Sequence, residues 1–449
     1  MKFSKIIPYI FLIISVSIFF YLIFKDLNFT DQQNNDYYYI YYIILFFLFL
    51  LSLALFRLKD NVRVNCFLIF VSISISLYFI EYSLIFNLKK KIIHLIETKT
   101  FYDSRNRIEV YNYFKKKDEE VYLRILHSNE RSKKTYDKGN NNIYAFSSIP
   151  NKKILTCNEN GYFSHFFSDR HGFNNNDEIW DQSSIKFVLI GDSFVQGDCV
   201  STNQNIAARL NYHSKKNALN LGLADSGPLK QYSILREYLI KNKKINYLLW
   251  FYYEENDLVE LENELKDPTL VKYFNDNNFS QNLVNRSIEI DKVLKNYHPE
   301  LIKQYKSLYK KRKKQKIIQF LKLYNLRNFL LKLENKDKKF IQQESFIKFE
   351  QILSQTSTEL KKNNIKLVFI YLPMFERFSF PEKLSQLQSN YKKIINIVKK
   401  NNILLVDINS EIFEKIDDPF KMFPYGMHGH YNAFGYDAVA KKILEKLYE

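Results

Sequence analysis

A serine preceded by a glycine and an acid follows a short apolar run in the middle of the chain. The stretch at 190–197 reads IGDSFVQG and continues the run IKFVLI at 185–190. Gly-Asp-Ser is also an ordinary turn sequence, so Ser193 alone is weak evidence of chemistry. A serine nucleophile needs a base to take its proton and donors to hold the developing oxyanion. The rest of the chain must therefore supply both.

Three other stretches carry suitable groups. NLGLADSG at 220–227 opens an amphipathic stretch, so its backbone N–H groups could face an anion. FYYEEND at 251–257 contains Asn256, whose side chain could donate an amide hydrogen. HGHYNAFG at 428–435 holds two of the eight histidines in the chain. With Ser193, these stretches offer a nucleophile, a base and oxyanion donors.

From residue 185 onward, short apolar runs alternate with amphipathic stretches. Continuous apolar strands separated by helices predict a parallel sheet covered on both faces, with ligands bound at the carboxyl ends of the strands. Ser193 falls just past the end of the first strand. Strands are predicted over 185–190, 218–221, 245–251, 366–371 and 403–407, and helices over about 203–214, 229–242, 346–363, 383–401 and 433–448.

Residues 261–345 interrupt this alternation. They are polar, lysine-rich and helix-prone, with an amphipathic piece at 317–333. We predict a helical insertion between the third and fourth strands. It could cap the site, lie on the membrane surface, or be an ordinary core helix.

Taken together, the four stretches resemble the SGNH superfamily, also called GDSL-type hydrolases. Its blocks are a GDS serine, a loop glycine, a G-x-N-D asparagine and a D-x-x-H histidine, and they occur here in that order over about 185–449. TCNENG, SDRHGFNN, GDCV, SGPL and WFYYEENDL are similar to a bacterial subgroup of membrane-anchored SGNH proteins and extend the resemblance back to about residue 100. The resemblance implies an α/β fold, with a flavodoxin-like three-layer parallel sheet.

The resemblance also implies roles for individual residues. Ser193 would be the nucleophile and His430 the general base. Asn256 and the backbone N–H of Ser193 would be oxyanion donors. Asp225 stands where the family has its loop glycine, and its N–H could still serve, with Gly227 as a substitute. The family implies no metal and no organic cofactor.

One family position is changed in a way that matters for the base. The acid expected three residues before His430 is Met427. An imidazole without an orienting carboxylate is a poorer base. The backbone carbonyl of Met427, the carboxylate of Asp407, or a different acid could take this role. We expect His430 to lie roughly 3–4 Å from Ser193 nonetheless.

Three uncharged apolar runs occupy the first ninety residues, at 6–24, 37–56 and 64–80. Each is long enough to cross a hydrocarbon core of roughly 30 Å as a helix, and none shows a polar stripe. A signal peptide is the rival interpretation of the first run alone, but no A-x-A-like site follows it. The prediction is a membrane region at 1–86, a linker and family-specific extension at 87–184, and an SGNH-like domain at 185–449.

Loop charge predicts the orientation of the membrane region. The loop between the second and third runs is net basic, and the loop between the first and second is net acidic. The positive-inside rule then places the N-terminus in the cytoplasm and the large domain outside. Together with the resemblance, this implies a bacterial inner membrane, with the large domain facing the periplasm or the outside. An oxidising exterior would allow Cys157 and Cys199, the only cysteines of the soluble part, to form a disulfide.

The formal net charge of +18 does not predict nucleic-acid binding. Lysine is abundant throughout, and the chain has neither zinc-finger spacing nor a Gly-rich phosphate loop. The expected function is a membrane-anchored serine esterase or acyltransferase acting on an acyl ester of a carbohydrate or lipid. The alternative is a catalytically impaired SGNH-fold protein that binds or assembles components of the cell envelope. The sequence does not indicate an oligomeric state.

Overall fold

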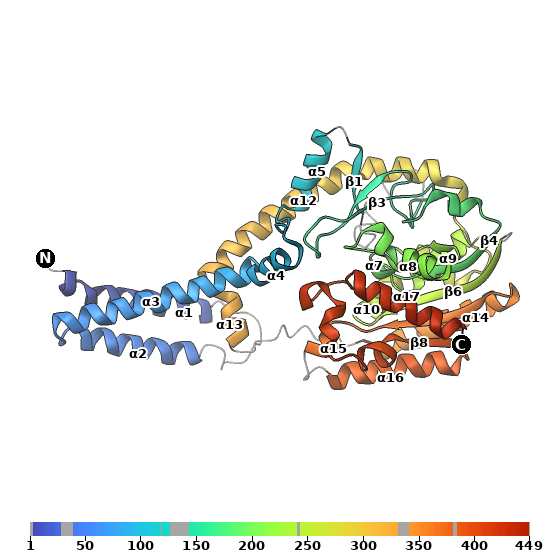
Figure 1. Cartoon of the computed structure of the whole chain (residues 1–449). Helices are drawn as coiled ribbons and strands as arrows, with labels where there is room; N and C mark the ends of the chain where they lie inside the picture. Colours follow the sequence, from blue (N-terminus) through green and yellow to red (C-terminus); the bar gives the residue numbers. More distant parts are fainter. Residues whose placement is uncertain are drawn as a thin grey trace. The chain divides into compact units, whose positions relative to one another are not determined.

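The computed structural model describes residues 3–27, 39–117, 119–125, 143–239, 243–330, 341–379 and 384–448. The chain forms two compact units. One consists of residues 1–88 and 315–334, and the other of residues 89–314 and 335–449. We call them the apolar helical unit and the α/β unit (Figure 1).

The α/β unit is built on a sheet of five parallel strands in the order β5-β4-β6-β7-β8. Of the five strands of this sheet, the first along the chain, β4, therefore lies between the second, β5, and the third, β6. This is the flavodoxin-like order, and it confirms the predicted fold class. The strands are β4 (Ser184–Ile190), β5 (Ala218–Asn220), β6 (Lys244–Tyr253), β7 (Lys366–Leu372) and β8 (Leu404–Asp407).

Helices cover both faces of this sheet, and α17 and α16 lie on opposite sides of it in Figure 1. Alternate residues of β6 show why the strands are continuously apolar. Leu248 and Trp250 pack into one core, and Leu249 and Phe251 into the other. The first core also holds α9 (Pro228–Tyr238), α14 (Gln343–Lys362) and α16 (Leu384–Lys400), and the second holds α8 (Ile206–Ser214) and α17 (Ala433–Tyr448).

The extension before β4 has a small sheet of its own, which the sequence pattern did not predict. β1 (Val121–Leu123) pairs in parallel with β2 (Lys153–Leu155), which pairs antiparallel with β3 (His165–Phe167). Helices α4 (Leu88–Thr98) and α5 (Arg107–Lys116) precede this sheet. The loop from β2 to β3 carries the TCNENG motif.

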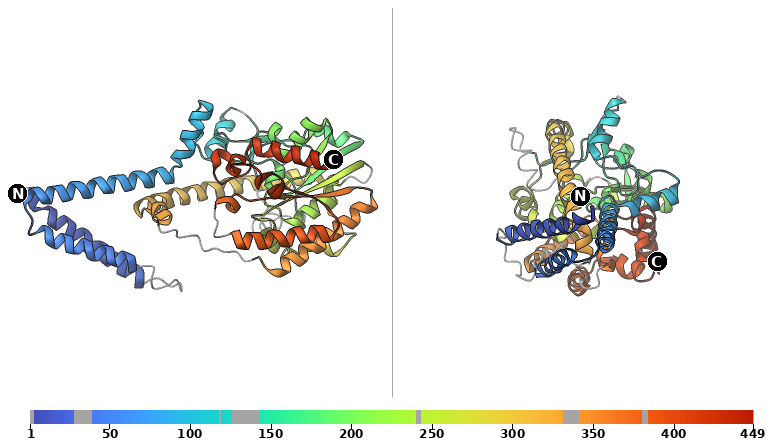
Figure 2. Two further views of the ribbon diagram at one scale, coloured as in Figure 1. Left: turned by 60° about the horizontal axis from the view of Figure 1, so that its bottom comes forward. Right: turned by 90° about the vertical axis from the view of Figure 1, so that its left-hand side faces the viewer.

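The apolar helical unit contains α1 (Ile7–Leu27), α2 (Tyr39–Leu55) and α3 (Asp60–Ile85), which Figure 2 shows from two further sides. Two helices, Phe3–Leu27 and Asp60–Ile85, are long and apolar enough to cross a membrane, and Tyr41–Leu55 is a shorter apolar helix. Ile7, Phe11 and Leu55 form a small core between them. The guanidinium of Arg63 donates to the carbonyls of Leu55 and Phe56, and so closes the turn between α2 and α3.

The insertion after β6 is mostly helical over its described residues. It contains α10 (Asp257–Glu264), α11 (Pro268–Asn275), α12 (Ser287–Leu321) and α13 (Tyr324–Leu330). Residues 315–334 belong to the apolar helical unit, where α13 packs on the end of α3. The buried Glu81 carboxylate accepts the backbone N–H groups of Asn325 and Leu326 at 3.1 and 2.8 Å.

Candidate active site

Ser193 begins the short helix α7 (Ser193–Gln196), directly after β4. Asp192 caps this helix, because its Oδ1 atom accepts the backbone N–H of Phe194 at 2.9 Å. The close packing of Gly222 against this turn excludes a side chain, since a Cβ there would lie 2.4 Å from the backbone nitrogen of Gln196. The end of β4, the cap and the loop after β5 together hold the half-buried Ser193 at the carboxyl edge of the sheet.

His430 lies just before α17 and faces Ser193. Its Nε2 atom is 2.8 Å from Ser193 Oγ, a hydrogen-bond distance. The ring of Phe194 packs beside the imidazole, with ring centroids 4.9 Å apart. The expected approach of the two side chains is therefore present, and slightly closer than predicted. The arrangement fits a serine hydroxyl that donates to a neutral imidazole.

The acid beside His430 is Glu159, from the TCNENG loop of the extension. Glu159 Oε1 is 3.1 Å from His430 Nδ1, and Glu159 Oε2 accepts the backbone N–H of His430 at 2.7 Å. One carboxylate thus holds both the ring and the backbone of the histidine. Sequence reasoning missed this residue, although it left room for a different acid. The predicted disulfide joins TCNENG to GDCV, which lies close to Ser193, and this was the signal that could have identified Glu159.

The other two candidates for this role lie elsewhere. The carboxylate of Asp407, at the end of β8, accepts from Tyr391, Asn409 and Ser410. These three hydrogen bonds occupy the Asp407 carboxylate near the end of β8. Met427 follows a short turn in which its N–H donates to the carbonyl of Pro424 at 3.0 Å. Neither residue has a hydrogen bond to His430 in the part of the chain that is described.

Charge on Glu159 and His430 is mutually stabilising. Burial alone would raise the pKa of Glu159, but the positive charge and the hydrogen bonds of His430 lower it to about 2. Burial alone would lower the pKa of His430, but Glu159 outweighs it and raises this pKa above its ordinary value. Glu159 is therefore a carboxylate at neutral pH, as the orienting and stabilising acid of a triad must be.

A disulfide between Cys157 and Cys199 ties the Glu159 loop to the segment after Ser193. The two Cα atoms are 5.0 Å apart, which confirms the prediction that these cysteines can bridge. Asn160 Nδ2 donates to the carbonyl of Cys199 at 2.8 Å, and Asn174 Nδ2 donates to the carbonyl of Gln196, also at 2.8 Å. The extension is therefore bonded to the segment around Ser193 at three points.

Gly429 leaves the space that the Glu159 carboxylate occupies. A Cβ on Gly429 would lie 2.6 Å from Glu159 Oε2, which no real Cβ contact tolerates. The glycine of HGHYN is thus required for the approach of Glu159 to the backbone of His430. Tertiary packing therefore explains why this position is a glycine. Backbone conformation does not require one, since Gly429 is not in the left-handed region.

Candidate oxyanion donors lie on two loops. Asp225 has φ +66°, in the left-handed region that favours glycine, which fits its place at the family's loop glycine. Among the described residues, the N–H groups of Ser193 and Asp225 donate to no other protein group. Gly227 cannot substitute, because its N–H donates to Glu264 Oε1 at 2.6 Å. Asn256 lies after β6 and is the residue that precedes α10. The hydrogen bond of its side chain to the Asp192 carboxylate lowers the pKa of Asp192.

Two buried carboxyl groups stand behind the serine. Burial raises the pKa of Asp192 to about 6, and burial together with the charge of Asp192 raises the pKa of Asp257 well above its ordinary value. Asp257 Oδ2 accepts the backbone N–H of Tyr253 at 3.1 Å. The two groups repel each other when both are charged, and this repulsion adds to the effect of burial on the pKa of Asp257.

A further carboxylate, Asp198, approaches His430 from the other side. Its Oδ2 atom is 3.9 Å from His430 Nε2, the same nitrogen that faces Ser193. Asp198 is buried and forms an ion pair with the buried guanidinium of Arg124, which follows β1 in the extension. Neither residue was among the candidates drawn from the sequence.

Two groups of side chains have the residue types of metal ligands. Glu159, Cys199 and His430 form one, but Cys199 is bonded to Cys157 and offers no thiolate. Glu255, Glu376 and His428 form the other at the surface, where His428 Nε2 is 3.2 Å from Glu376 and 3.8 Å from Glu255. An exposed ion pair of this kind accounts for the second group.

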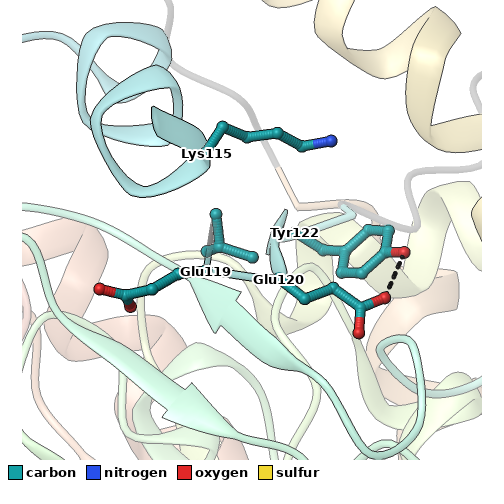
Figure 3. A pocket seen from close by; sticks show the side chains of 5 residues that line it. Lys115, Glu119, Glu120 and Tyr122 are labelled. Atoms are coloured by element: carbon teal, nitrogen blue, oxygen red, sulfur yellow. Dashed lines mark hydrogen bonds between the residues drawn. The ribbon is translucent and has the colours of Figure 1, made fainter. Parts of the chain in front are cut away.

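A cavity of about 260 Å³ lies apart from these residues, at the edge of the small sheet. Figure 3 shows Lys115 above Glu119, Glu120 and Tyr122. The carboxylates here already have partners. Glu119 and Glu120 pair with Lys153 and Lys152, each at 2.6 Å, and Glu120 also accepts from Tyr122. None of the side chains that line this cavity belongs to the Ser193 site.

Comparisons with known proteins found similar chains among the solved structures. No protein-family model matches the sequence, and no curated protein matches it. Solved structures that are similar include a G-D-S-L family protein from Desulfitobacterium hafniense (12% identity, 59% of this chain and 99% of that chain, TM-score 0.31). Others are a lipase/acylhydrolase from Enterococcus faecalis (10%, 59% and 95%, 0.33) and an acetylxylan esterase from Geobacillus stearothermophilus (12%, 59% and 94%, 0.31). The strand order and the positions of the site residues are features of this chain itself.

Those features agree with the resemblance seen in the sequence. Ser193 follows the first strand of the sheet, Asn256 follows the third, and His430 precedes the last helix. Parallel strands bring these positions to one edge of the sheet, as the SGNH arrangement requires. The α/β unit therefore has the flavodoxin-like parallel sheet that the resemblance implies, with these three residues at one edge of it.

Proposed function

We propose that this protein is a membrane-anchored SGNH-type serine esterase or acyltransferase. The observation that supports it best is the chain of contacts from Ser193 Oγ to His430 Nε2 at 2.8 Å, and from His430 Nδ1 to Glu159 Oε1 at 3.1 Å. A nucleophile, a base and an orienting acid in hydrogen-bond contact are what acyl transfer needs. The fold alone would not support an activity.

In the first half-reaction, Ser193 Oγ attacks the carbonyl carbon of an acyl ester while its proton passes to His430 Nε2. The Glu159 carboxylate stabilises the imidazolium and keeps Nδ1 protonated. The negative charge that develops on the carbonyl oxygen would be held by the N–H groups of Ser193 and Asp225 and by the Asn256 amide. Collapse of the intermediate breaks the ester C–O bond, and the leaving alcohol takes the proton from His430.

In the second half-reaction, a water or an acceptor hydroxyl gives its proton to His430 as its oxygen attacks the Ser193 ester. Collapse then returns the proton to Ser193 Oγ and releases an acid or a new ester. Water makes the protein an esterase and a hydroxyl acceptor makes it an acyltransferase. No metal or organic cofactor takes part in either half-reaction as proposed.

The substrate class follows from where we place the α/β unit. The two long apolar helices favour attachment to a membrane, and the disulfide favours an oxidising exterior. The packing of α13 on α3 through Glu81 supports a membrane-surface placement of residues 317–330, because α3 is one of the two long apolar helices. An ester on a cell-envelope carbohydrate or lipid, such as an O-acetyl group, is therefore the proposed substrate.

A serine-directed fluorophosphonate probe tests the proposal. The full-length protein in detergent should be labelled, and Ser193→Ala should not be. Ser354→Ala, an exposed serine on α14, is the matched control and should be labelled like the wild type. Absence of labelling in a correctly folded wild-type protein would overturn the enzyme proposal in favour of a binding or assembly protein.

A further inference from the structure

A carboxylate near the proton-carrying nitrogen of a catalytic histidine should interfere with it. Ser193 Oγ and Asp198 Oδ2 lie 2.8 and 3.9 Å from His430 Nε2, so a small rotation of Asp198 would bring it to hydrogen-bond distance. A charge-assisted N–H···carboxylate bond is about twice as strong as a bond to a neutral hydroxyl. A free Asp198 carboxylate would therefore bind the imidazolium N–H in place of Ser193 or the leaving alcohol.

The structure contains a cation that holds this carboxylate. Arg124 and Asp198 form an ion pair in which both side chains are buried, with 9% and 1% of their surfaces exposed. In the part of the chain that is described, Arg124 and His430 are the only cationic partners of Asp198. Arg124 itself belongs to the extension, one residue after β1, and its backbone N–H donates to the carbonyl of Leu155 at 3.1 Å.

We propose that Arg124 is a positioning residue for the Ser193–His430 pair. By binding the Asp198 carboxylate it leaves His430 Nε2 to Ser193, and it keeps the imidazole from being trapped as a charged partner of Asp198. This inference rests on the proposed function and deepens it. It also gives the extension a second task at the site, besides supplying Glu159.

The electrostatic surroundings of His430 have the sign that this role needs. Arg124 lowers the pKa of His430, and Glu159 and Asp192 raise it. Loss of Arg124 would remove one lowering influence and release a buried carboxylate beside Nε2, and both changes raise the pKa of His430. The charged groups that face this imidazole are Glu159, Asp192, Asp198 and Arg124, with Glu255 also within electrostatic range.

Four variants of the full-length protein separate this role from a structural one. Arg124→Met frees the carboxylate, Asp198→Asn removes its charge, the double variant removes both charges, and Arg124→Lys keeps a cation. Arg209→Met, which breaks the ion pair of Arg209 with Asp437 between α8 and α17, controls for loss of stability alone. Fluorophosphonate labelling rates are measured from pH 5 to 9, on protein shown by its melting curve to be folded.

Arg124→Met should label at least about 100-fold more slowly than the wild type at neutral pH, because its base is protonated and misdirected. The acid limb of its pH profile should move to higher pH. The double variant should recover most of the rate and return the limb to the wild-type position, and Arg124→Lys should recover part of the rate. Arg209→Met should melt earlier without a shift of the limb.

Histidine NMR makes the test independent of turnover. In protein labelled with carbon-13 at histidine Cε1, the His430 signal, identified by its loss in His430→Gln, should titrate at higher pH in Arg124→Met. In the double variant, His430 should again titrate at the wild-type pH. An unchanged His430 titration in Arg124→Met, or a double variant as slow as the single one, would overturn the role of Arg124. If the wild-type protein is not labelled but the His430 titration still shifts in Arg124→Met, the enzyme proposal alone is overturned.

Discussion

The two parts of the α/β unit that meet at Ser193 hold their residues by different means. The parallel sheet places Ser193 and Asn256 at strand ends, where backbone pairing along whole strands determines their positions. The extension places Glu159 on a loop between two three-residue strands, where a disulfide and a few hydrogen bonds hold it, and Arg124 directly after a third short strand. In the proposed reaction, the sheet holds the nucleophile and the extension adjusts the base.

If the sheet carries the chemistry, the largest loss should come from its own residues. Ser193→Ala should abolish fluorophosphonate labelling and ester turnover, because the nucleophilic oxygen is gone. His430→Ala should reduce both by about 1,000-fold or more, since no other base among the described residues has a hydrogen bond to the Ser193 hydroxyl. Labelling of Ser193→Ala at the wild-type rate would mean that another serine reacts.

Glu159→Gln tests the contribution of the extension most directly. The imidazolium would lose its stabilising charge, and turnover should fall by about 100- to 10,000-fold. Because Glu159 raises the pKa of His430, the acid limb of the rate profile should move to lower pH in this variant. Glu120→Gln, in the same extension but paired with Lys152, should keep both rate and limb. An unmoved limb in Glu159→Gln would show that this carboxylate does not act on His430.

Removing the disulfide should loosen the extension without deleting any group that acts on substrate. We expect Cys157→Ser/Cys199→Ser to lower stability by about 2–5 kcal/mol. Turnover should fall by about 10- to 100-fold, as Glu159 loses its fixed position. Cys66→Ser, in α3, is the control. Melting curves and turnover with and without reductant measure both effects, and full activity of the double variant would show that the hydrogen bonds alone position the loop.

Gly429→Ala probes the contact between the two parts at a single atom. A Cβ at this position would displace the Glu159 carboxylate, so turnover should fall by about tenfold while labelling is retained. Gly426→Ala is a comparison in the same loop, where the new Cβ would meet nothing closer than 3.6 Å. That variant carries its own backbone strain, because Gly426 has φ +64°, and should therefore lose stability more than turnover. Equal turnover of Gly429→Ala and the wild type would argue against close contact at Glu159.

The smallest effect is expected where the family has its acid. Met427→Asp should change turnover by no more than about twofold, because Glu159 already holds His430 Nδ1. In Glu159→Gln/Met427→Asp, by contrast, the new carboxylate has a vacant partner and could recover part of the lost rate. A large gain for Met427→Asp alone would show that Glu159 is a weak substitute for the family acid.

Much of the sheet could be predicted from the sequence because its signals are local. A strand buried on both faces must be apolar at successive positions, and the five such runs after residue 185 all form strands of the sheet. The helices between them follow the same reasoning. Parallel strands then bring Ser193, Asn256 and His430 to one edge without further information, and their order along the chain was enough to relate them to the SGNH blocks.

The partners of His430 could not be predicted in the same way. Glu159 is 271 residues from His430 in sequence, and Arg124 belongs to a segment whose strands are too short to show a pattern. What brings these two side chains to the histidine is the cross-link from Cys157 to Cys199, the space left by Gly429 and the ion pair with Asp198. Such contacts join segments with no shared periodicity, so only the tertiary structure decides which acid and which cation reach the base.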